Sequence, residues 1–66
     1  MNITVNGSRQ DCPPDSNISA LLERLDLQGK RIALEINKEI VPRSEYDSFA
    51  LTEGDTVEII QAIGGG

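Results

Sequence analysis

The sequence predicts an α+β fold in which one helix covers one face of a mixed sheet of four or five strands. Two patterns carry this prediction. Apolar and polar residues alternate in MNITV and RIALEI, as they do in half-buried strands. In ISALLERL, apolar residues recur at positions i, i+3, i+4 and i+7, which form one stripe on a helix. The helix must cover one face of the sheet, because the sheet is the only apolar partner available to its stripe.

The first strand and its return predict a β-hairpin. The apolar residues of MNITV share one face. Asn6-Gly7 is a strong hairpin signal, because both central residues of a type I′ turn need a positive φ. We expect the returning strand at Arg9 to Cys12. Pro13-Pro14 would end it, since proline cannot donate to the ladder.

The helix is expected to follow the prolines directly. Asp15 or Ser16 can cap it by accepting a free backbone N–H. Gly29 is placed to end it in the left-handed conformation. Its buried stripe would consist of Ile18, Leu21, Leu22 and Leu25.

The second half of the chain predicts two further strands and a helical turn before the last strand. RIALEIN is one strand, and Ile40-Val41 is a short one that Pro42 limits to an edge position. Ser44 and Asp47 have the spacing of a capping box, which predicts a single helical turn. That turn would pack Tyr46, Phe49 and Leu51 inward.

The last strand, VEIIQAI, is expected to turn Val57 and Ile59 toward the helix and to leave Glu58, Ile60 and Ala62 on the open face. A right-handed crossover through the helix would place this strand centrally and parallel to the first. That arrangement is the ubiquitin-like β-grasp architecture. We expect residues 1–63 to form this domain and residues 64–66 to form a flexible C-terminal glycine tail.

The composition excludes several classes of function. The net charge of −5 argues against nucleic acid as a partner. Cys12 is the single cysteine and there is no histidine, so neither a disulfide framework nor a metal site is expected. No apolar run is long enough to span a membrane. With no signal-peptide pattern and one cysteine, the expected location is the cytoplasm.

The end of the sequence, AIGGG, suggests a carboxylate carried on a slender stalk. Glycines lack Cβ atoms, so such a tail can enter a narrow channel. A carboxylate must be activated before it reacts with a nucleophile. The sequence has no phosphate-binding GxxxxGK[ST] stretch and no histidine base, so the chain is expected to be a substrate and not an enzyme.

The whole chain resembles the ThiS family, the sulfur carriers of thiazole formation in thiamine biosynthesis. Three segments carry the resemblance: N-x-x-I-V-P-R from Asn37 to Arg43, E-G-D-x-V from Glu53 to Val57, and the A-I-G-G-G end. The resemblance implies that a ThiF-type enzyme adenylates Gly66 with ATP. The product would become a thiocarboxylate with sulfur from a donor protein and pass that sulfur to thiazole synthase (ThiG). Gly65 would allow the terminus to thread into both enzymes, and the chain itself would bind no cofactor.

Partner contacts are expected where the open face leads into the tail, at Ile60, Ala62, Ile63 and Gly64, because contiguous apolar surface marks interaction sites. Glu35 and Glu58 could orient a basic partner. Cys12 is interpreted as a buried core thiol. Arg43 is interpreted as a solvated turn residue.

Two alternatives remain beside the thiamine-pathway carrier. The small subunit of molybdopterin synthase is a sulfur carrier with the same fold and tail, although this chain is shorter and contains the IVPR segment. The other alternative is a β-grasp module that binds its partner without covalent chemistry and whose glycines are a loose end.

Overall fold

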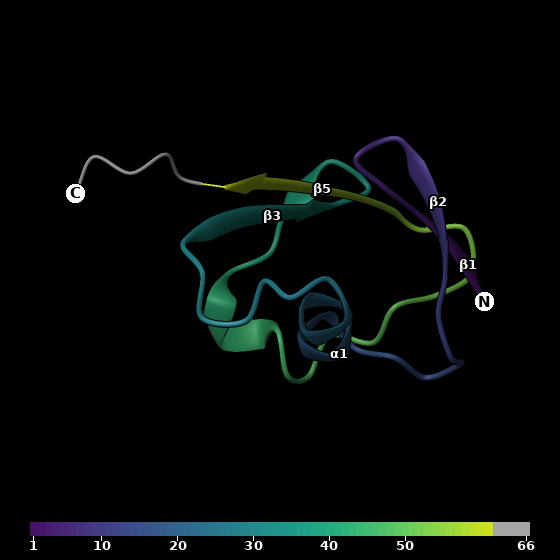
Figure 1. Ribbon diagram of the computed structural model, residues 1–66, viewed down its shortest axis with the longest axis horizontal. Helices are drawn as coiled ribbons and strands as arrows, with labels where there is room; N and C mark the ends of the chain where they lie inside the picture. Colours follow the sequence, from purple (N-terminus) through teal and green to yellow (C-terminus); the bar gives the residue numbers. More distant parts are fainter. Residues whose placement is uncertain (62–66) are drawn as a thin grey trace.

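The computed structural model describes residues 1–61, and Figure 1 shows their arrangement. These residues form a sheet in the order β2-β1-β5-β3-β4, with helix α1 against one face. The predicted α+β β-grasp architecture is confirmed, with five strands in the described part of the chain. The elements are β1 (Asn2–Val5), β2 (Ser8–Asp11), α1 (Ile18–Arg24), β3 (Ile32–Ile36), β4 (Glu39–Ile40), the 3₁₀ helix η1 (Arg43–Glu45) and β5 (Thr56–Gln61).

The hairpin turn and the central strand agree with the prediction, while the returning strand β2 runs from Ser8 to Asp11 and excludes Cys12, which was expected in it. Asn6 and Gly7 have φ values of 49° and 83°, as a type I′ turn requires. Strand β5 lies between β1, to which it is parallel, and β3, to which it is antiparallel. The short strand β4 is at the edge, next to the proline that follows it.

The helix boundaries differ from the prediction. The residue that caps α1 is Asn17, whose side-chain oxygen accepts a hydrogen bond of 2.7 Å from the Ala20 N–H. Ser16 is buried, and its hydroxyl donates to the Pro13 carbonyl at 2.6 Å, while Asp15 is in a left-handed turn with φ 68°. Neither residue therefore has the geometry of the cap.

The end of α1 was also misplaced by the sequence pattern. The helix ends at Arg24, and the left-handed residue just after it is Asp26 with φ 61°. Gly29 does have a positive φ, 72°, but it belongs to the loop that leads to β3. Leu25, expected on the buried stripe, is only partly buried as the C-cap.

The predicted capping box at Ser44 and Asp47 is wrong. η1 begins after Pro42, which makes no side-chain cap hydrogen bond. The Asp47 carboxylate instead accepts a hydrogen bond from the Ser19 hydroxyl, and the Asp47 carbonyl accepts one of 3.0 Å from the Asn17 amide. The turn is thus tied to α1 and not capped within itself. Its apolar residues lie inward as predicted, with Tyr46 and Leu51 buried and Phe49 partly buried.

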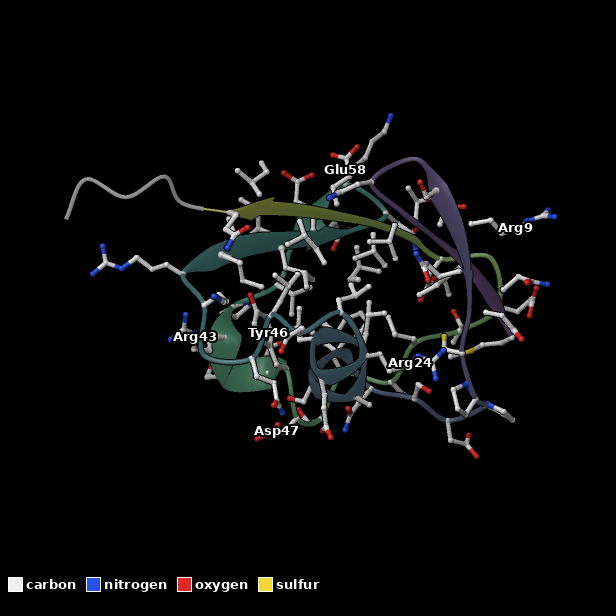
Figure 2. All side chains as sticks on the ribbon, viewed as in Figure 1. Arg9, Arg24, Arg43, Tyr46, Asp47 and Glu58 are labelled. Atoms are coloured by element: carbon white, nitrogen blue, oxygen red, sulfur yellow. The ribbon has the colours of Figure 1, made fainter. Side chains whose placement is uncertain are left out.

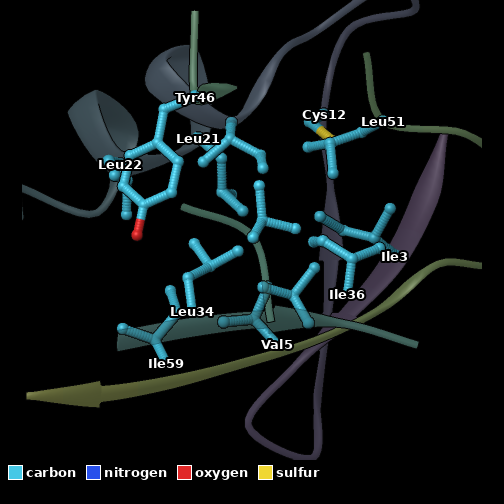
Figure 3. Close-up of a cluster of buried hydrophobic side chains, with 13 residues drawn as sticks. Ile3, Val5, Cys12, Leu21, Leu22, Leu34, Ile36, Tyr46, Leu51 and Ile59 are labelled. Atoms are coloured by element: carbon cyan, nitrogen blue, oxygen red, sulfur yellow. The ribbon is translucent and has the colours of Figure 1, made fainter. Parts of the chain in front are cut away.

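The core fills the space between α1 and the sheet (Figure 3). Its side chains come from alternate positions of the strands, from one stripe of α1 and from the segments that follow β2, β4 and η1. A chain of this size buries about 60% of the surface that its unfolded form exposes, less than a larger domain does, so each core side chain matters. The buried apolar residues are Ile3, Val5, Cys12, Ile18, Leu21, Leu22, Leu34, Ile36, Val41, Tyr46, Leu51, Val57 and Ile59.

The other face of the sheet has no element packed against it in the described part of the chain (Figure 1). The strand register assigns alternate residues to this side, because successive side chains point to opposite faces. We call this surface the open face, and its residues are Asn2, Thr4, Arg9, Asp11, Ala33, Glu35, Ile40, Thr56, Glu58 and Ile60.

Candidate functional site

Strand β5 leads toward the C-terminal residues from the centre of the sheet. Val57 and Ile59 point into the core, with 0% and 9% of their surface exposed, as predicted. Glu58 points the opposite way, away from α1 (Figure 2). β5 pairs with β1 at Thr56 and Val57 and with β3 from Val57 to Gln61, so its start has a neighbour on both sides and its last residues are held by β3.

The start of β5 is held by a buried carboxylate. Asp55 is 7% exposed and accepts three hydrogen bonds. Two come from the backbone N–H and hydroxyl of Thr52, at 2.9 and 3.0 Å, and the third comes from the Asn37 side-chain amide at 3.0 Å. Asn37 in turn accepts from the Thr56 N–H at 3.0 Å. The two inner segments that carry the family resemblance therefore meet here, and they anchor β5.

A second anchor lies in the middle of β5. The Asn6 side chain donates to the Ile59 carbonyl at 3.1 Å and accepts from the Ile59 N–H at 2.8 Å. β1 ends at Val5, and its pairing with β5 ends at Val57. The Asn6 side-chain amide takes the place of a further β1 residue, because it makes both hydrogen bonds to Ile59. From the sequence alone, Asn6 is expected only as a turn residue. Aspartate and glycine are also common at this turn position, so only the register reveals why asparagine is useful here.

Asn6→Gly is expected to lower the free energy of unfolding by about 1–2 kcal/mol, because two hydrogen bonds to β5 are lost while the positive φ stays accessible. Urea denaturation measures the loss, and hydrogen exchange of the Ile59 amide locates it. Asn6→Asp keeps the acceptor and loses the donor, so it should lose less. Equal stability of Asn6→Gly and the native chain would contradict the anchor.

The open face carries both of the large apolar side chains that are strongly exposed in the described part of the chain. Ile40 is 74% exposed and Ile60 is 61% exposed. Between them in the register, Glu35 of β3 lies directly opposite Glu58 of β5. The face therefore combines apolar and acidic groups, and it borders the strand that leads to the C-terminus.

The structure places only part of the predicted site. Ile60 is exposed on the open face, as expected. The predicted contacts Ala62, Ile63 and Gly64, and the predicted reactive residues Gly65 and Gly66, lie outside the described residues. Their roles remain predictions.

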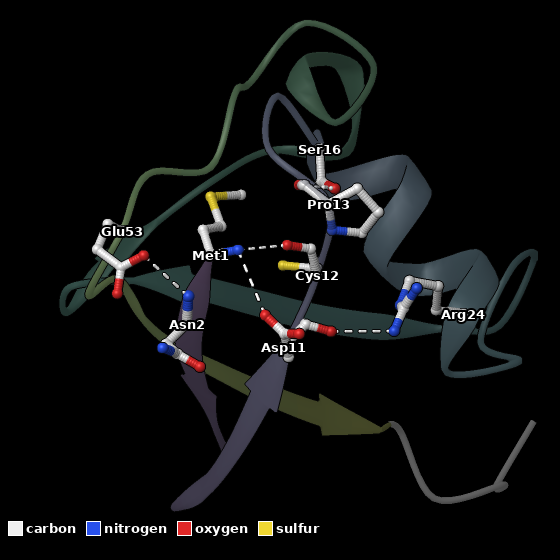
Figure 4. Close-up of polar contacts among 8 residues, drawn as sticks. All are labelled: Met1, Asn2, Asp11, Cys12, Pro13, Ser16, Arg24 and Glu53. Carbon is white, nitrogen blue, oxygen red and sulfur yellow. Dashed lines mark hydrogen bonds and ion pairs between the residues drawn. The ribbon is translucent and has the colours of Figure 1, made fainter.

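Cys12 is 3% exposed and belongs to the core, so its interpretation as a buried thiol is confirmed. Its carbonyl accepts a hydrogen bond of 2.6 Å from the terminal amine of Met1, which also pairs with Asp11 at 3.3 Å (Figure 4). Figure 3 shows Cys12 beside Leu51, at the other end of the cluster from Ile59. The thiol is thus far from the end of β5.

Arg43 is exposed, and its guanidinium donates to the Lys30 carbonyl at 3.2 Å. The contact joins η1 to the loop before β3, where Arg43 and Tyr46 line part of a cavity of about 310 Å³ (Figure 2). Residues 1–61 contain no group of three or more histidine, cysteine, aspartate or glutamate side chains that could hold a metal ion. The same residues contain no helix of sufficient length and apolarity to cross a membrane.

In residues 1–61, the sheet order, the one α-helix against the sheet and the central position of β5 define a small domain of the ubiquitin-like β-grasp class. The model of the ThiS family matches residues 3–66. The chain therefore belongs to the ThiS family.

Individual relatives agree with this assignment. The sulfur carrier protein ThiS of Escherichia coli is 35% identical over the whole of both chains. The crystal structure of the thiamine biosynthesis protein ThiS from Geobacter metallireducens superimposes with a TM-score of 0.85 at 33% identity, also over the whole of both chains. A thiazole synthase of Paramagnetospirillum magneticum is 38% identical over 66 residues, and the chain spans 20% of the length of that relative.

Proposed function

We propose that this chain is the sulfur carrier for thiazole formation in thiamine biosynthesis and that the carboxylate of Gly66 carries the sulfur. The observation that supports this most directly is that the ThiS family match continues through the terminal glycines to Gly66. The full-length similarity to a protein named as a sulfur carrier supports the same conclusion.

The proposed chemistry has two steps. A carboxylate oxygen of Gly66 attacks the α-phosphate of ATP, which forms the acyl-adenylate and releases pyrophosphate. In the second step, the terminal sulfur of a persulfide on a donor protein attacks the acyl carbon and AMP leaves, which forms an acyl disulfide. A thiol, as the two-electron reductant, then attacks the donor's own sulfur in that disulfide, so the S–S bond breaks, the thiocarboxylate is released, and the thiol and the donor are left joined as a disulfide. A ThiF-type enzyme supplies the ATP site and the catalytic groups. This chain is a protein co-substrate and binds no cofactor of its own.

The firm attachment of β5 to the rest of the domain supports a role in which this chain presents its terminus and the enzyme supplies the catalytic groups. The strand that leads to the terminus is held by Asn37 and Asn6, which accept hydrogen bonds from its Thr56 and Ile59 N–H groups, while Asp55 accepts one from the Asn37 amide. Rigid presentation lowers the entropy that a partner must remove when it binds the terminal residues. The chain is expected to act in the cytoplasm, where ATP is available.

Thiazole synthase is the proposed acceptor of the sulfur. The relative from P. magneticum that bears this name contains a stretch similar to the whole of this chain. Two activities joined in one polypeptide are held at a high effective concentration, which suits a carrier and the enzyme that it supplies. We therefore expect the separate carrier to dock on thiazole synthase.

Deletion of Gly66 is expected to abolish formation of the thiocarboxylate, because the reacting carboxylate moves back by one residue. The measurement is the intact mass of the chain after incubation with ATP, a ThiF-type enzyme and a sulfur donor. The native chain should gain the mass difference between sulfur and oxygen. The variant Glu45→Gln, altered on the exposed surface of η1, should gain it as well.

Omission of ATP should also prevent the gain in mass for the native chain. If the native chain gained no sulfur with every component present, or if the chain without Gly66 gained as much, the proposal would be wrong.

A further inference from the structure

Two carboxylates face each other at the centre of the open face. Glu35 of β3 and Glu58 of β5 are direct partners in the antiparallel register, so they project from the same side of the sheet. The side chains of such partners are near neighbours, and like charges in this position are destabilising. The register therefore places two like charges side by side on neighbouring strands, of which β5 is the one that leads to the terminus.

Within residues 1–61, no ion pair joins Glu35 or Glu58 to a lysine or arginine. Arg9 of the open face lies on β2, which β1 separates from β5. Glu58 is exposed, and Glu35 is half-buried. Lys38 lies nearby in sequence, in the turn between β3 and β4, but forms no ion pair with either carboxylate. The acidic pair is thus available to a cation from outside.

Apolar side chains flank the pair on both sides. Ile40 of β4 is the register partner of Glu35, so it ends the same cross-strand row. Ile60 is two residues beyond Glu58 on the same face, opposite Ala33. With 74% and 61% of their surfaces exposed, the two isoleucines offer apolar contact beside the charges. Such a combination fits a partner surface in which a cationic side chain is surrounded by apolar ones.

We propose that Glu35 and Glu58 together bind an arginine or lysine side chain of the ThiF-type adenylating enzyme, with Ile40 and Ile60 packed against apolar residues around that cation. The inference rests on the proposed function. A guanidinium has five N–H donors and can serve two carboxylates at once, which makes arginine the better fit. The repulsion within the free carrier becomes an attraction in the complex.

The choice of the adenylating enzyme follows from charge. This enzyme must bring a chain of net charge −5 and its terminal carboxylate up to the polyphosphate of ATP. Anions repel one another, so the enzyme surface next to that site needs positive charge to hold the carrier. The open face includes β5, the strand that leads to the reacting terminus. When the terminus is in the active site, we therefore expect the open face to contact the positively charged surface of the enzyme.

The test compares Glu35→Gln and Glu58→Gln with the matched control Glu45→Gln, which removes the same charge from the exposed surface of η1. The affinity of each full-length chain for the ThiF-type enzyme of the same organism is measured by calorimetry, and the stability by thermal melting. Each variant of the pair should bind about tenfold more weakly. Each should also melt about 2 °C higher, because the like-charge contact is gone.

Weaker binding together with a higher melting temperature would identify Glu35 and Glu58 as residues that bind the enzyme and do not stabilise the fold. A lower melting temperature for the pair variants would mean that the glutamates serve the fold, and this result would overturn the inference. Unchanged affinity would overturn it too, as would a loss that the control reproduces or a loss seen only with thiazole synthase. Release of pyrophosphate by the native chain and the enzyme, measured in parallel, reports on the proposed function independently of these outcomes.

Discussion

Truncation of Leu34 to alanine is expected to lower the free energy of unfolding by about 2–5 kcal/mol. Leu34 is fully buried in β3 and belongs to the same cluster as Ile59 and Tyr46, so its loss leaves a cavity between the sheet and the elements that cover it (Figure 3). A domain of this size has a total stability of about 3–10 kcal/mol. The variant should therefore be substantially unfolded at a moderate temperature.

Urea denaturation followed by circular dichroism measures this effect. The matched control is Ile40→Ala, which truncates a side chain that is 74% exposed on the other side of the sheet. That change should alter the stability by less than about 0.5 kcal/mol. If the two truncations had similar effects, the assignment of the core to the helix-covered face would be wrong.

The sheet could be predicted from the sequence because its signals are local. Alternation in MNITV and RIALEI reports which residues are buried, and Asn6-Gly7 specifies the turn through its φ values. The central position of β5 followed from the single crossover through the helix. None of these inferences needed a detailed tertiary contact.

The helix boundaries could not be predicted because several residues compete for one role. Asp15, Ser16 and Asn17 can each cap a helix, and tertiary contacts decide among them. Asn17 also pairs with Ala50 in an isolated bridge and donates to the Asp47 carbonyl. These contacts join segments that are about half the chain apart, and no local pattern indicates them.

The sequence predicted on which face of the sheet each residue of the candidate site lies, but not which residues are opposite each other on neighbouring strands. Alternation placed Glu58 and Ile60 on the open face, and this is confirmed. That Glu35 is opposite Glu58 depends on the register of β3 against β5, and a shift of two residues would keep the faces but separate the pair. In the same way, the link between Asn37 and Asp55 connects two segments that were noted separately in the sequence.

Replacement of Asp55 with alanine is expected to lower the free energy of unfolding by about 2–3 kcal/mol, since a carboxylate with three hydrogen bonds is removed from a buried position. The donors of Thr52 and Asn37 lose their acceptor and remain close to the core. Because Asn37 also holds the Thr56 N–H, the start of β5 should loosen. Hydrogen exchange of the β5 amides and urea denaturation measure the two consequences.

Two further variants separate the network from the size of the side chain. Asp55→Asn keeps the shape and one acceptor oxygen, so about half of the loss should remain. Asn37→Gly accommodates the positive φ of 51° at that position and removes only the amide. Combined with Asp55→Ala, it should cost less than the sum of the two single changes, because both remove the same hydrogen bond. If the losses in the free energy of unfolding were strictly additive, Asp55 and Asn37 would act independently. The hydrogen bond between them would then not contribute to holding the start of β5.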